Sequence, residues 1–301
     1  MMNRRDFLKT GFLGALSMTT AGKSAVAAVT ANTTPDLVAL HGSTPEVMWR
    51  EGIKAMGGIE KFVKKGAKVV VKPNIAWTQP PEYAANTTPE LVAAIVRDVL
   101  KAGAAEVIVF DHSCDNGPDC YRVSGIAEAA TGAGAKVLHA TDRKTYRKVK
   151  SNDAKVMTEA EVFSAILDCD TFINVPILKH HGGAKMSAAM KNLMGIVWDR
   201  RIMHRKGLVN TIPDLLSFRK PDLNVVDAYR MMMARGPRGG NLRDVALGKF
   251  MLISTDPVAV DSAAVKLLKF DEKDVRYLQE AADRKLGEKD LTKLNIKRIE
   301  M

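Results

Sequence analysis

Short runs of apolar and β-branched residues alternate along this chain of 301 residues with amphipathic segments of about ten to fifteen residues. This alternation is typical of a mostly parallel β-sheet covered by helices. The predicted strands span residues 37–41, 68–72, 106–110, 136–139, 171–175, 223–226 and 250–254. The pattern shows no internal repeat or linker. It therefore predicts an α/β fold in a single domain over residues 28–301.

Helix start and stop signals fit between these strands. Threonine followed by proline opens predicted helices over 44–56 and 88–102, and glycine follows each of them. Thr158 with Glu161 three residues later is a capping box, which predicts a third helix over 158–168.

Two regions depart from the alternation. Residues 182–217 have a helical composition without an intervening strand, which predicts a helical insertion over one edge of the sheet. The last thirty residues are polar, and 291–299 is expected to form a short docking strand or a tail.

The first 27 residues have the order of an export signal: a charged start, a weakly apolar stretch and small residues before a cleavage site. The paired Arg4 and Arg5 resemble a twin-arginine (Tat) signal. A short amphipathic helix is the alternative. The signal predicts recognition by the Tat export machinery, a periplasmic or extracellular location, and no stable membrane anchor after cleavage. Since Tat carries folded passengers, it also favours a metal or redox cofactor.

The charge is concentrated in one segment. The chain has 45 Lys+Arg and 34 Asp+Glu, and removal of residues 1–27 leaves 41 and 33, a formal charge of +8. Residues 179–206 alone hold seven of the basic residues and one acid. The sequence has no helix-turn-helix, zinc finger or transmembrane run. We therefore expect a small anionic ligand and no nucleic-acid partner.

Polar and ionisable residues lie at the carboxyl ends of the predicted strands, where open α/β sheets bind ligands. They are Lys72, Asn74, Asp111, His112, Lys179, His181 and Asp227. Turns favour Asp and Asn but have no particular need of Lys or His. Lys179 and His181 are therefore the strongest functional candidates.

The segment 179–206 adds further candidates. Lys191 and Asn192 could bind and orient a ligand, whereas Lys185, Arg200 and Arg201 are interpreted as solvent-exposed positions of a basic helix. The nearby Gly-Pro-Arg-Gly-Gly at 236–240 is not a dinucleotide fingerprint, because no strand precedes it and no helix follows. It predicts a loop over the site or a tight turn.

Six short strings in order resemble the domain-of-unknown-function 362 family. They are Val-Lys-Pro-Asn at 71–74, Thr-Pro-Glu-Leu-Val at 88–92, Gly-Ala-Ala-Glu-Val at 103–107, Ile-Asn-Val-Pro-Ile-Leu-Lys-His-His at 173–181, Met-Lys-Asn-Leu-Met-Gly at 190–195 and Asp-Pro-Val-Ala-Val-Asp at 256–261. The resemblance implies an α/β domain of this size, joined in some relatives to ferredoxin-type modules. It does not imply a reaction.

The resemblance also implies characteristic positions. These are Lys72, Asn74, Asp111, Lys179, His181, Lys191, Asn192, His204, Asp227, Asp256 and Asp261. A second histidine, His180, precedes His181 where relatives have a small polar residue, so either could be the functional one. The chain lacks the cysteine spacing of ferredoxins, and no self-contained iron-sulfur cluster is expected.

Two of the three cysteines lie close together. Cys114 and Cys120 follow the predicted strand that ends at Asp111, and a disulfide or unpaired thiols are favoured there over a metal clip with Asp111 and His112. Cys169 is interpreted as a small buried hydrophobe.

Three functions fit these residues. The favoured one is an enzyme with His181 as general acid or base, Asp227 orienting it or binding a metal, and Lys179 binding an anion. Cofactor or ligand binding falls to Lys72, Asn74, Lys191 and Asn192. The second is a transition-metal protein that uses Asp111, His112, His181 and His204. The third is a non-catalytic periplasmic protein that binds an anionic small molecule.

Overall fold

The computed structural model describes residues 34–301, so the predicted signal at 1–27 lies outside the described residues. Ten strands form one mixed sheet. They are β1 (Leu37–His41), β2 (Lys68–Pro73), β3 (Glu106–Asp111), β4 (Lys136–His139), β7 (Thr171–Val175), β8 (Ile177–His181), β9 (Lys185–Ser187), β10 (Leu223–Met232), β11 (Val245–Ser254) and β12 (Ile296–Glu300). The predicted α/β class is confirmed.

The strand order is β12-β1-β11-β10-β7-β2-β3-β4, and β8 pairs with β10 and β9. Strand β11 is antiparallel to both β1 and β10, and β9 is antiparallel to β8. The remaining pairs are parallel. Of the two expectations for 291–299, a docking strand or a tail, the structure has a strand, β12, which pairs with β1.

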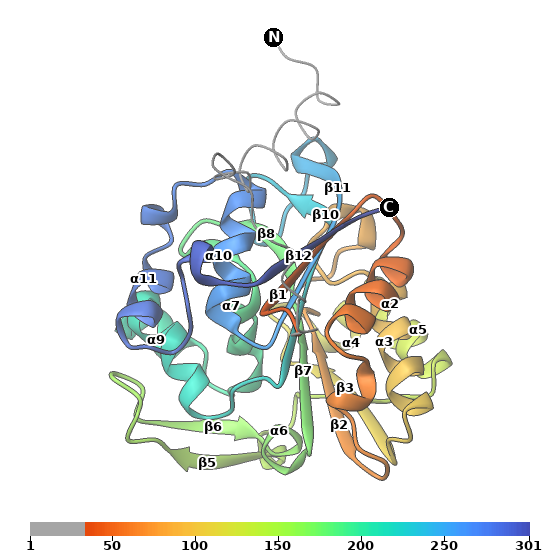
Figure 1. Ribbon diagram of the computed structural model, residues 1–301. Helices are drawn as coiled ribbons and strands as arrows, with labels where there is room; N and C mark the ends of the chain where they lie inside the picture. The colour runs from red at the N-terminus through yellow and green to blue at the C-terminus, as the bar shows by residue number, and fades with distance from the viewer. Residues whose placement is uncertain (1–33) are drawn as a thin grey trace, which may run out of the picture.

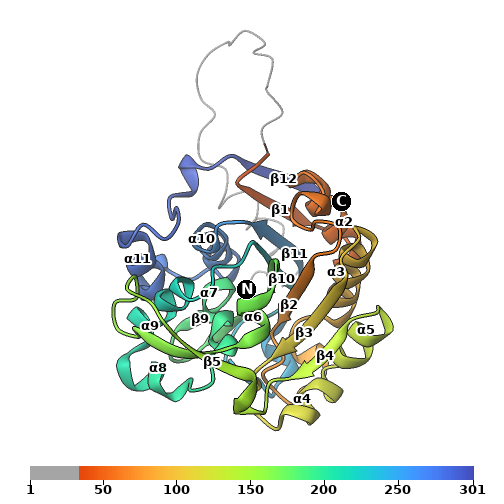
Figure 2. The same cartoon turned by 90° about the horizontal axis from the view of Figure 1, so that it is seen from below.

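Helices cover both faces of the sheet, as Figures 1 and 2 show. One face carries α2 (Pro45–Ala55), α3 (Pro89–Lys101), α4 (Gly117–Val123) and α5 (Ile126–Gly132). The other carries α7 (Ala189–Asn192), α8 (Arg201–Lys206), α9 (Leu208–Asp214), α10 (Pro257–Leu268) and α11 (Arg276–Asp283). Helix α3 illustrates the cause, because Leu91, Ile95 and Val99 recur at helical spacing and are all buried against the strands.

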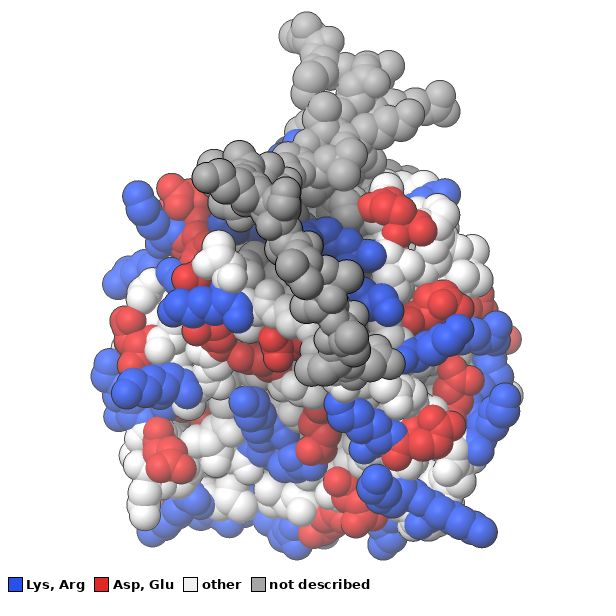
Figure 3. Space-filling model, in the orientation of Figure 1, with Lys and Arg blue, Asp and Glu red and all other residues white. Residues whose placement is uncertain are grey.

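Basic and acidic side chains are interspersed on the face of the molecule shown in Figure 3. Exposed ion pairs such as Lys148 with Glu159 (3.0 Å) and Arg205 with Asp199 (3.5 Å) also bring opposite charges together on the surface of the protein. The described residues of that face therefore form no single basic surface of the kind that binds a polyanion.

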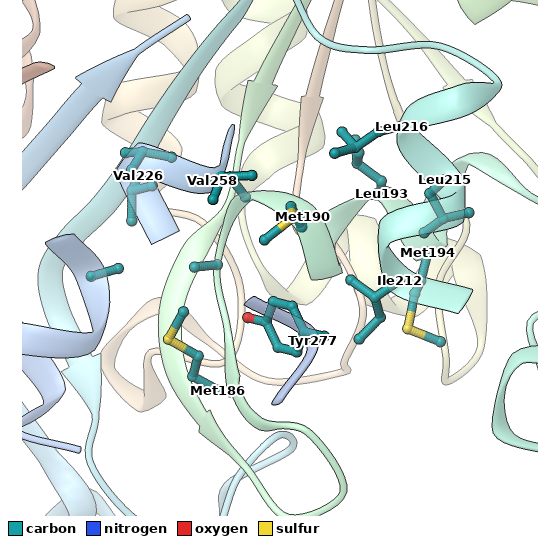
Figure 4. Close-up of a cluster of buried hydrophobic side chains, with 14 of the residues drawn as sticks. Met186, Met190, Leu193, Met194, Ile212, Leu215, Leu216, Val226, Val258 and Tyr277 are labelled. Atoms are coloured by element: carbon teal, nitrogen blue, oxygen red, sulfur yellow. The ribbon is translucent and has the colours of Figure 1, made fainter. Parts of the chain in front are cut away.

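The segment 182–217 packs on one face of the sheet rather than over its edge. It begins with a strand, β9, and continues through α7, the short 3₁₀ turn η4 (Leu193–Ile196), α8 and α9. Figure 4 shows its buried side chains beside those of α10 and α11. Its apolar residues belong to the larger core of the molecule, among them Met186, Met190, Leu193, Ile212 and Leu215. The segment is thus an integral layer of the fold.

The helix predicted over 158–168 is wrong for its first half. Residues Glu159–Phe163 form strand β6, which pairs with β5 (Tyr146–Lys150), and only α6 (Ser164–Asp168) is helical. The carboxylate of Glu161, read as part of a capping box, pairs with Arg143 at 2.8 Å. Cross-strand pairing with a neighbouring segment of the chain overrode the local helix signal.

The order of strands creates a crevice. From β2 the chain passes through α3 to β3 on one side, and it later returns to β7 on the other side of β2. Such a switch point opens at the carboxyl ends of the two strands, where the helices leave toward opposite faces. Within residues 34–301, no helix is both long and apolar enough to cross a membrane.

Candidate functional site

A cleft of about 480 Å³ opens at this switch point. Most of the residues predicted for the site line it: Asn74, Asp111, His112, Lys179, His181, Lys191, Asn192 and His204. The predicted residues Lys72 and Asp227 are buried outside its lining. The crevice rule for parallel sheets accounts for the first five, since β2, β3 and β8 deliver these side chains from their carboxyl ends. Helices α7 and α8 supply the other three.

Strand β8 supplies the cleft with Lys179. The side chain is 1% exposed, and its Nζ donates to Asn74 Oδ1 at 3.3 Å and to the carbonyl of Ala85. Among the described residues, no carboxylate lies within ion-pair distance of this ammonium group. Burial therefore lowers the pKa of Lys179 to about 7.

The two adjacent histidines have different surroundings because side chains alternate along a strand. His181 lies on the same side of β8 as Lys179 and lines the cleft, where its Nδ1 accepts hydrogen bonds from the N–H groups of Gly183 (3.0 Å) and Ala184 (3.1 Å). His180 faces away, and its Nδ1 accepts the N–H of Gly236 at 3.1 Å. The structure thus brings only His181 into the cleft.

The electrostatics of His181 follow from this position. Burial, and after it the positive charges of the neighbouring Lys191 and Lys179, together lower its pKa to about 3. Lys191 contacts the sulfur of Met194 at 3.3 Å, and burial lowers the pKa of this lysine to about 8. His204, at the exposed rim, also has a lowered pKa, through burial and then Lys191.

Arg200 belongs to the cleft, contrary to its interpretation as a solvated position. Its guanidinium donates to the carbonyl oxygens of His112 (2.7 Å) and Ser113 (2.5 Å) and to the sulfur of Cys114 (3.1 Å). Arg201 also lines the cleft. Lys185 is exposed as predicted and pairs with Asp274 at 3.3 Å. The composition of the segment alone gave no signal that separates these positions.

Lys72 and Asp111 form a buried ion pair below the cleft. The Nζ of Lys72 lies 2.8 Å from Asp111 Oδ1, and Asp111 Oδ2 accepts the N–H of Ile75 at 2.7 Å. Burial lowers the pKa of Lys72. Gly195 closes over the pair, because a Cβ there would lie 1.9 Å from Asp111 Oδ1. Asp111 lines the cleft, whereas Lys72 lies behind it and does not, so ligand binding by Lys72 stays a prediction.

Asp227 occupies a different place from the one expected. Its carboxylate accepts the N–H groups of Thr88 (2.7 Å) and Tyr229 (3.0 Å), and it does not contact His181. Burial raises the pKa of Asp227. It fixes the start of α3 against β10, which a strand-end position in the sequence could not distinguish from a place in the site.

The predicted metal ligands do not form a metal site. Within residues 34–301, no three His, Cys, Asp or Glu side chains are placed so that they could hold an ion. Asp111 is paired with Lys72, and the Nδ1 of His112 lies 3.1 Å from the carbonyl oxygen of Val197. The donor set therefore does not fit a transition metal.

The cysteines of the described chain are free thiols. Cys114 is exposed at the cleft, Cys120 is buried, and Cys169 is half-buried with its thiol 3.3 Å from the carbonyl of Ile166. Of the alternatives for Cys114 and Cys120, the structure has unpaired thiols.

A chain of asparagine amides leads from the cleft across the sheet. The Nδ2 of Asn74 donates to Asn192 (3.0 Å), Asn192 to Asn174 (2.8 Å), and Asn174 to Asn224 (3.0 Å). The last amide donates to the backbone carbonyl of Ser254 at 3.4 Å. Each amide is held by its neighbour, so the chain orients Asn74 and Asn192 at the cleft.

The loop that joins β10 to β11 arches over the cleft. Pro237 lines it, and Arg238 pairs with Asp115 at 3.2 Å on the loop that follows β3. Of the two interpretations of the Gly-Pro-Arg-Gly-Gly string, the structure has the loop over the site.

The sequence profile of the family described as domain of unknown function (DUF362) matches residues 69–266, a range that contains all of the cleft residues above. The chain belongs to the DUF362 family. A relative from Synechocystis sp., described as a thylakoid-associated protein, is 28% identical over 253 residues, which cover 78% of this chain and 73% of the relative.

Two solved structures are similar to this DUF362 chain at 12% sequence identity. The lactate racemase apoprotein from Thermoanaerobacterium thermosaccharolyticum has a TM-score of 0.49 over 82% of this chain, and a protein from Thermotoga maritima has 0.44 over 81%. The chain spans 60% of the length of each of these proteins.

Proposed function

We propose that this DUF362 protein is an enzyme that binds a small carboxylate or phosphate compound in the cleft and acts on it by proton transfer. The observation that carries the proposal is Lys179, a buried ammonium group with no carboxylate partner among the described residues and a pKa of about 7. A structural lysine is normally exposed or paired, because burying its charge is costly. A perturbed lysine in a cleft is typical of functional sites.

The charges around the cleft support an anionic ligand. Lys179, Lys191, Arg200 and Arg201 line it, and the carboxylate of Asp111 is already neutralised by Lys72. Several cations held together in a partly enclosed space attract an anion more strongly than the same charges on an open surface. Their mutual repulsion, which contributes to the low pKa values of Lys179 and His181, would be relieved by a bound anion.

Calorimetric titration with sulfate and with oxalate at low ionic strength tests the binding step. Lys179→Ala should weaken binding about tenfold, as expected for loss of a charge-assisted hydrogen bond. Lys185→Ala is the matched control, because that lysine lies in the same basic segment and pairs with Asp274 on the surface. Equal affinity of wild type and Lys179→Ala would contradict the proposal.

Catalysis is separated from binding by product analysis. Small carboxylates and phosphate esters are incubated with the protein and followed by NMR in heavy water. Conversion that Lys179→Ala abolishes supports an enzyme. Tight binding of the same compounds without conversion would instead support a non-catalytic binding protein.

We also propose that residues 1–27 direct Tat export. The paired Arg4 and Arg5 followed by a weakly apolar stretch support it. Cell fractionation of a bacterial host is expected to place the wild-type chain in the periplasm and the variant with both arginines replaced by lysine in the cytoplasm. The same distribution for both chains would contradict the proposal.

A further inference from the structure

His112 presents a free lone pair to the cleft. Its Nδ1 lies 3.1 Å from the carbonyl oxygen of Val197, and its ring stacks on Trp198 with 5.2 Å between centroids. A carbonyl oxygen can only accept a hydrogen bond, so Nδ1 carries the proton. In the neutral ring, Nε2 is then the nitrogen with the lone pair. Burial lowers the pKa of His112, which favours this neutral form.

His181 presents the opposite group. Its Nδ1 accepts two backbone N–H groups, from Gly183 and Ala184, so the lone pair of Nδ1 is occupied and the proton of the neutral ring is on Nε2. A second proton on Nδ1 would face both N–H groups and the nearby lysines. The pKa of about 3 agrees with a ring that stays neutral. His181 therefore offers the cleft an N–H donor and no lone pair.

The two rings reach the cleft from different strands. His112 directly follows β3, whereas His181 ends β8, which pairs with β10. Strand β8 follows β7 along the same side of β10, and β2 lies between β7 and β3. Asn74, which follows β2, also lines the cleft. A ligand held by the cations of the cleft would thus meet a proton acceptor that follows β3 and a hydrogen-bond donor at the end of β8.

We propose that His112 is the general base of this site and that His181 is an oxyanion donor, acting on a small carboxylate or phosphate compound that contains a carbonyl group. This inference rests on the proposed function and names its substrate class. Donors fixed where negative charge develops are the usual way to stabilise an enolate, and a histidine held neutral is suited to that task.

The step balances without a co-reactant. The bond between hydrogen and the carbon beside the carbonyl breaks, and the proton forms a bond to Nε2 of His112, which becomes an imidazolium. The electron pair moves to the carbonyl oxygen, where the Nε2–H of His181 holds the enolate by a hydrogen bond and keeps its own proton. Return of a proton from His112 to the same carbon regenerates the compound, with that hydrogen exchanged for one from solvent.

Nitrogen-15 NMR of the full-length protein tests the two tautomers. His112→Asn and His181→Gln assign the ring signals. We expect Nδ1–H for His112 and Nε2–H for His181 near neutral pH. Diethyl pyrocarbonate, which acylates imidazole nitrogens with a free lone pair, should modify His112 and spare His181. The same tautomer in both rings, or a charged His181, would overturn the assignment.

Oxalate, a planar dianion that resembles an enolate of a small keto acid, tests the substrate class against sulfate. His181→Ala should weaken oxalate binding about tenfold, because a hydrogen bond to a charged oxygen is lost. His181→Gln retains an N–H group and should recover most of the affinity, and sulfate binding should change little in either variant. Thermal unfolding checks that each variant is folded.

The outcomes separate the two proposals. If His181→Ala weakens oxalate and sulfate equally, or neither, the donor role is wrong while the anion site remains. If the wild-type protein binds neither oxalate nor sulfate, the proposed function itself fails.

Discussion

The ammonium groups of Lys179 and Lys191 lie in the cleft, and burial lowers their pKa values to about 7 and about 8. A bound anion favours the charged form of each and raises both pKa values. Anion affinity should therefore fall as the pH rises through this range, and binding near pH 8 should take up protons. Calorimetry in two buffers of different ionisation enthalpy measures the uptake, and Lys179→Met should reduce it. Binding without proton uptake would contradict this prediction.

Removal of one partner of the buried pair of Lys72 and Asp111 should be strongly destabilising, because it leaves the other charge uncompensated. Asp111→Asn leaves the ammonium group of Lys72 buried without a counter-ion, which should cost about 3 kcal/mol in the free energy of unfolding. The double variant Lys72→Met with Asp111→Asn should recover part of that loss, since it removes both charges. Urea denaturation measures each value.

An exposed pair provides the control for this measurement. Asp119 pairs with Arg122 at 3.0 Å on the surface, and Asp119→Asn should change stability little. A similar loss in Asp119→Asn and Asp111→Asn would show that burial is not the cause.

The sequence predicted some of these positions because the carboxyl ends of parallel strands meet at one edge. That rule explains why Asn74, Lys179 and His181 line one cleft, although their roles stay a prediction. It could not place Asp227, because the partners that hold its carboxylate, such as the N–H of Thr88, are far away in sequence. The same holds for the tautomer of His112, which depends on a carbonyl 85 residues along the chain.

In the turn η4, position 195 lies so close to the buried pair of Lys72 and Asp111 that only glycine fits there. Gly195→Ala should cost about 2 kcal/mol in the free energy of unfolding, because the new Cβ would overlap Asp111 Oδ1 and approach Lys72 within 2.8 Å. The matched control is Gly132→Ala at the end of α5, where a Cβ meets nothing within 4 Å. Equal unfolding midpoints for both variants in thermal denaturation would contradict the prediction.

The elements that the sequence predicted correctly are those with strong local signals. Helix α3 has Thr88 and Pro89 at its start and a continuous apolar face, and β2 and β3 are short β-branched runs. The hairpin of β5 and β6 was missed because its exposed residues, such as Lys148 and Glu159, stabilise it only through pairing across strands. The local sequence pattern does not indicate that pairing.

At the scale of the whole molecule, the cost of burying a cation makes stability depend on pH. The pKa of Lys179 is about 7 in the folded protein and 10.5 ordinarily, so between these values the unfolded chain binds more protons. The contribution of this group to stability therefore rises with pH across that range. The substitution Lys179→Met removes this pH-dependent contribution.

Chemical denaturation at several pH values measures this effect. The stability of Lys179→Met relative to wild type should be greatest near pH 7 and should decrease toward pH 10. Lys185→Met, at an exposed position, should run parallel to wild type. If the stability of Lys179→Met also ran parallel to that of wild type across this pH range, burial would not destabilise the charged form of Lys179.

The hydrogen bonds in the chain of asparagines all point in the same direction. A backbone carbonyl can only accept, so Ser254 determines which end of the amide of Asn224 faces it, and each following amide must then face the same way. The last oxygen of the series, Asn74 Oδ1, is left to receive the ammonium group of Lys179. The orientation of one peptide group in β11 thus determines, through four asparagine side chains, that Asn74 turns its oxygen and not its NH₂ group toward Lys179.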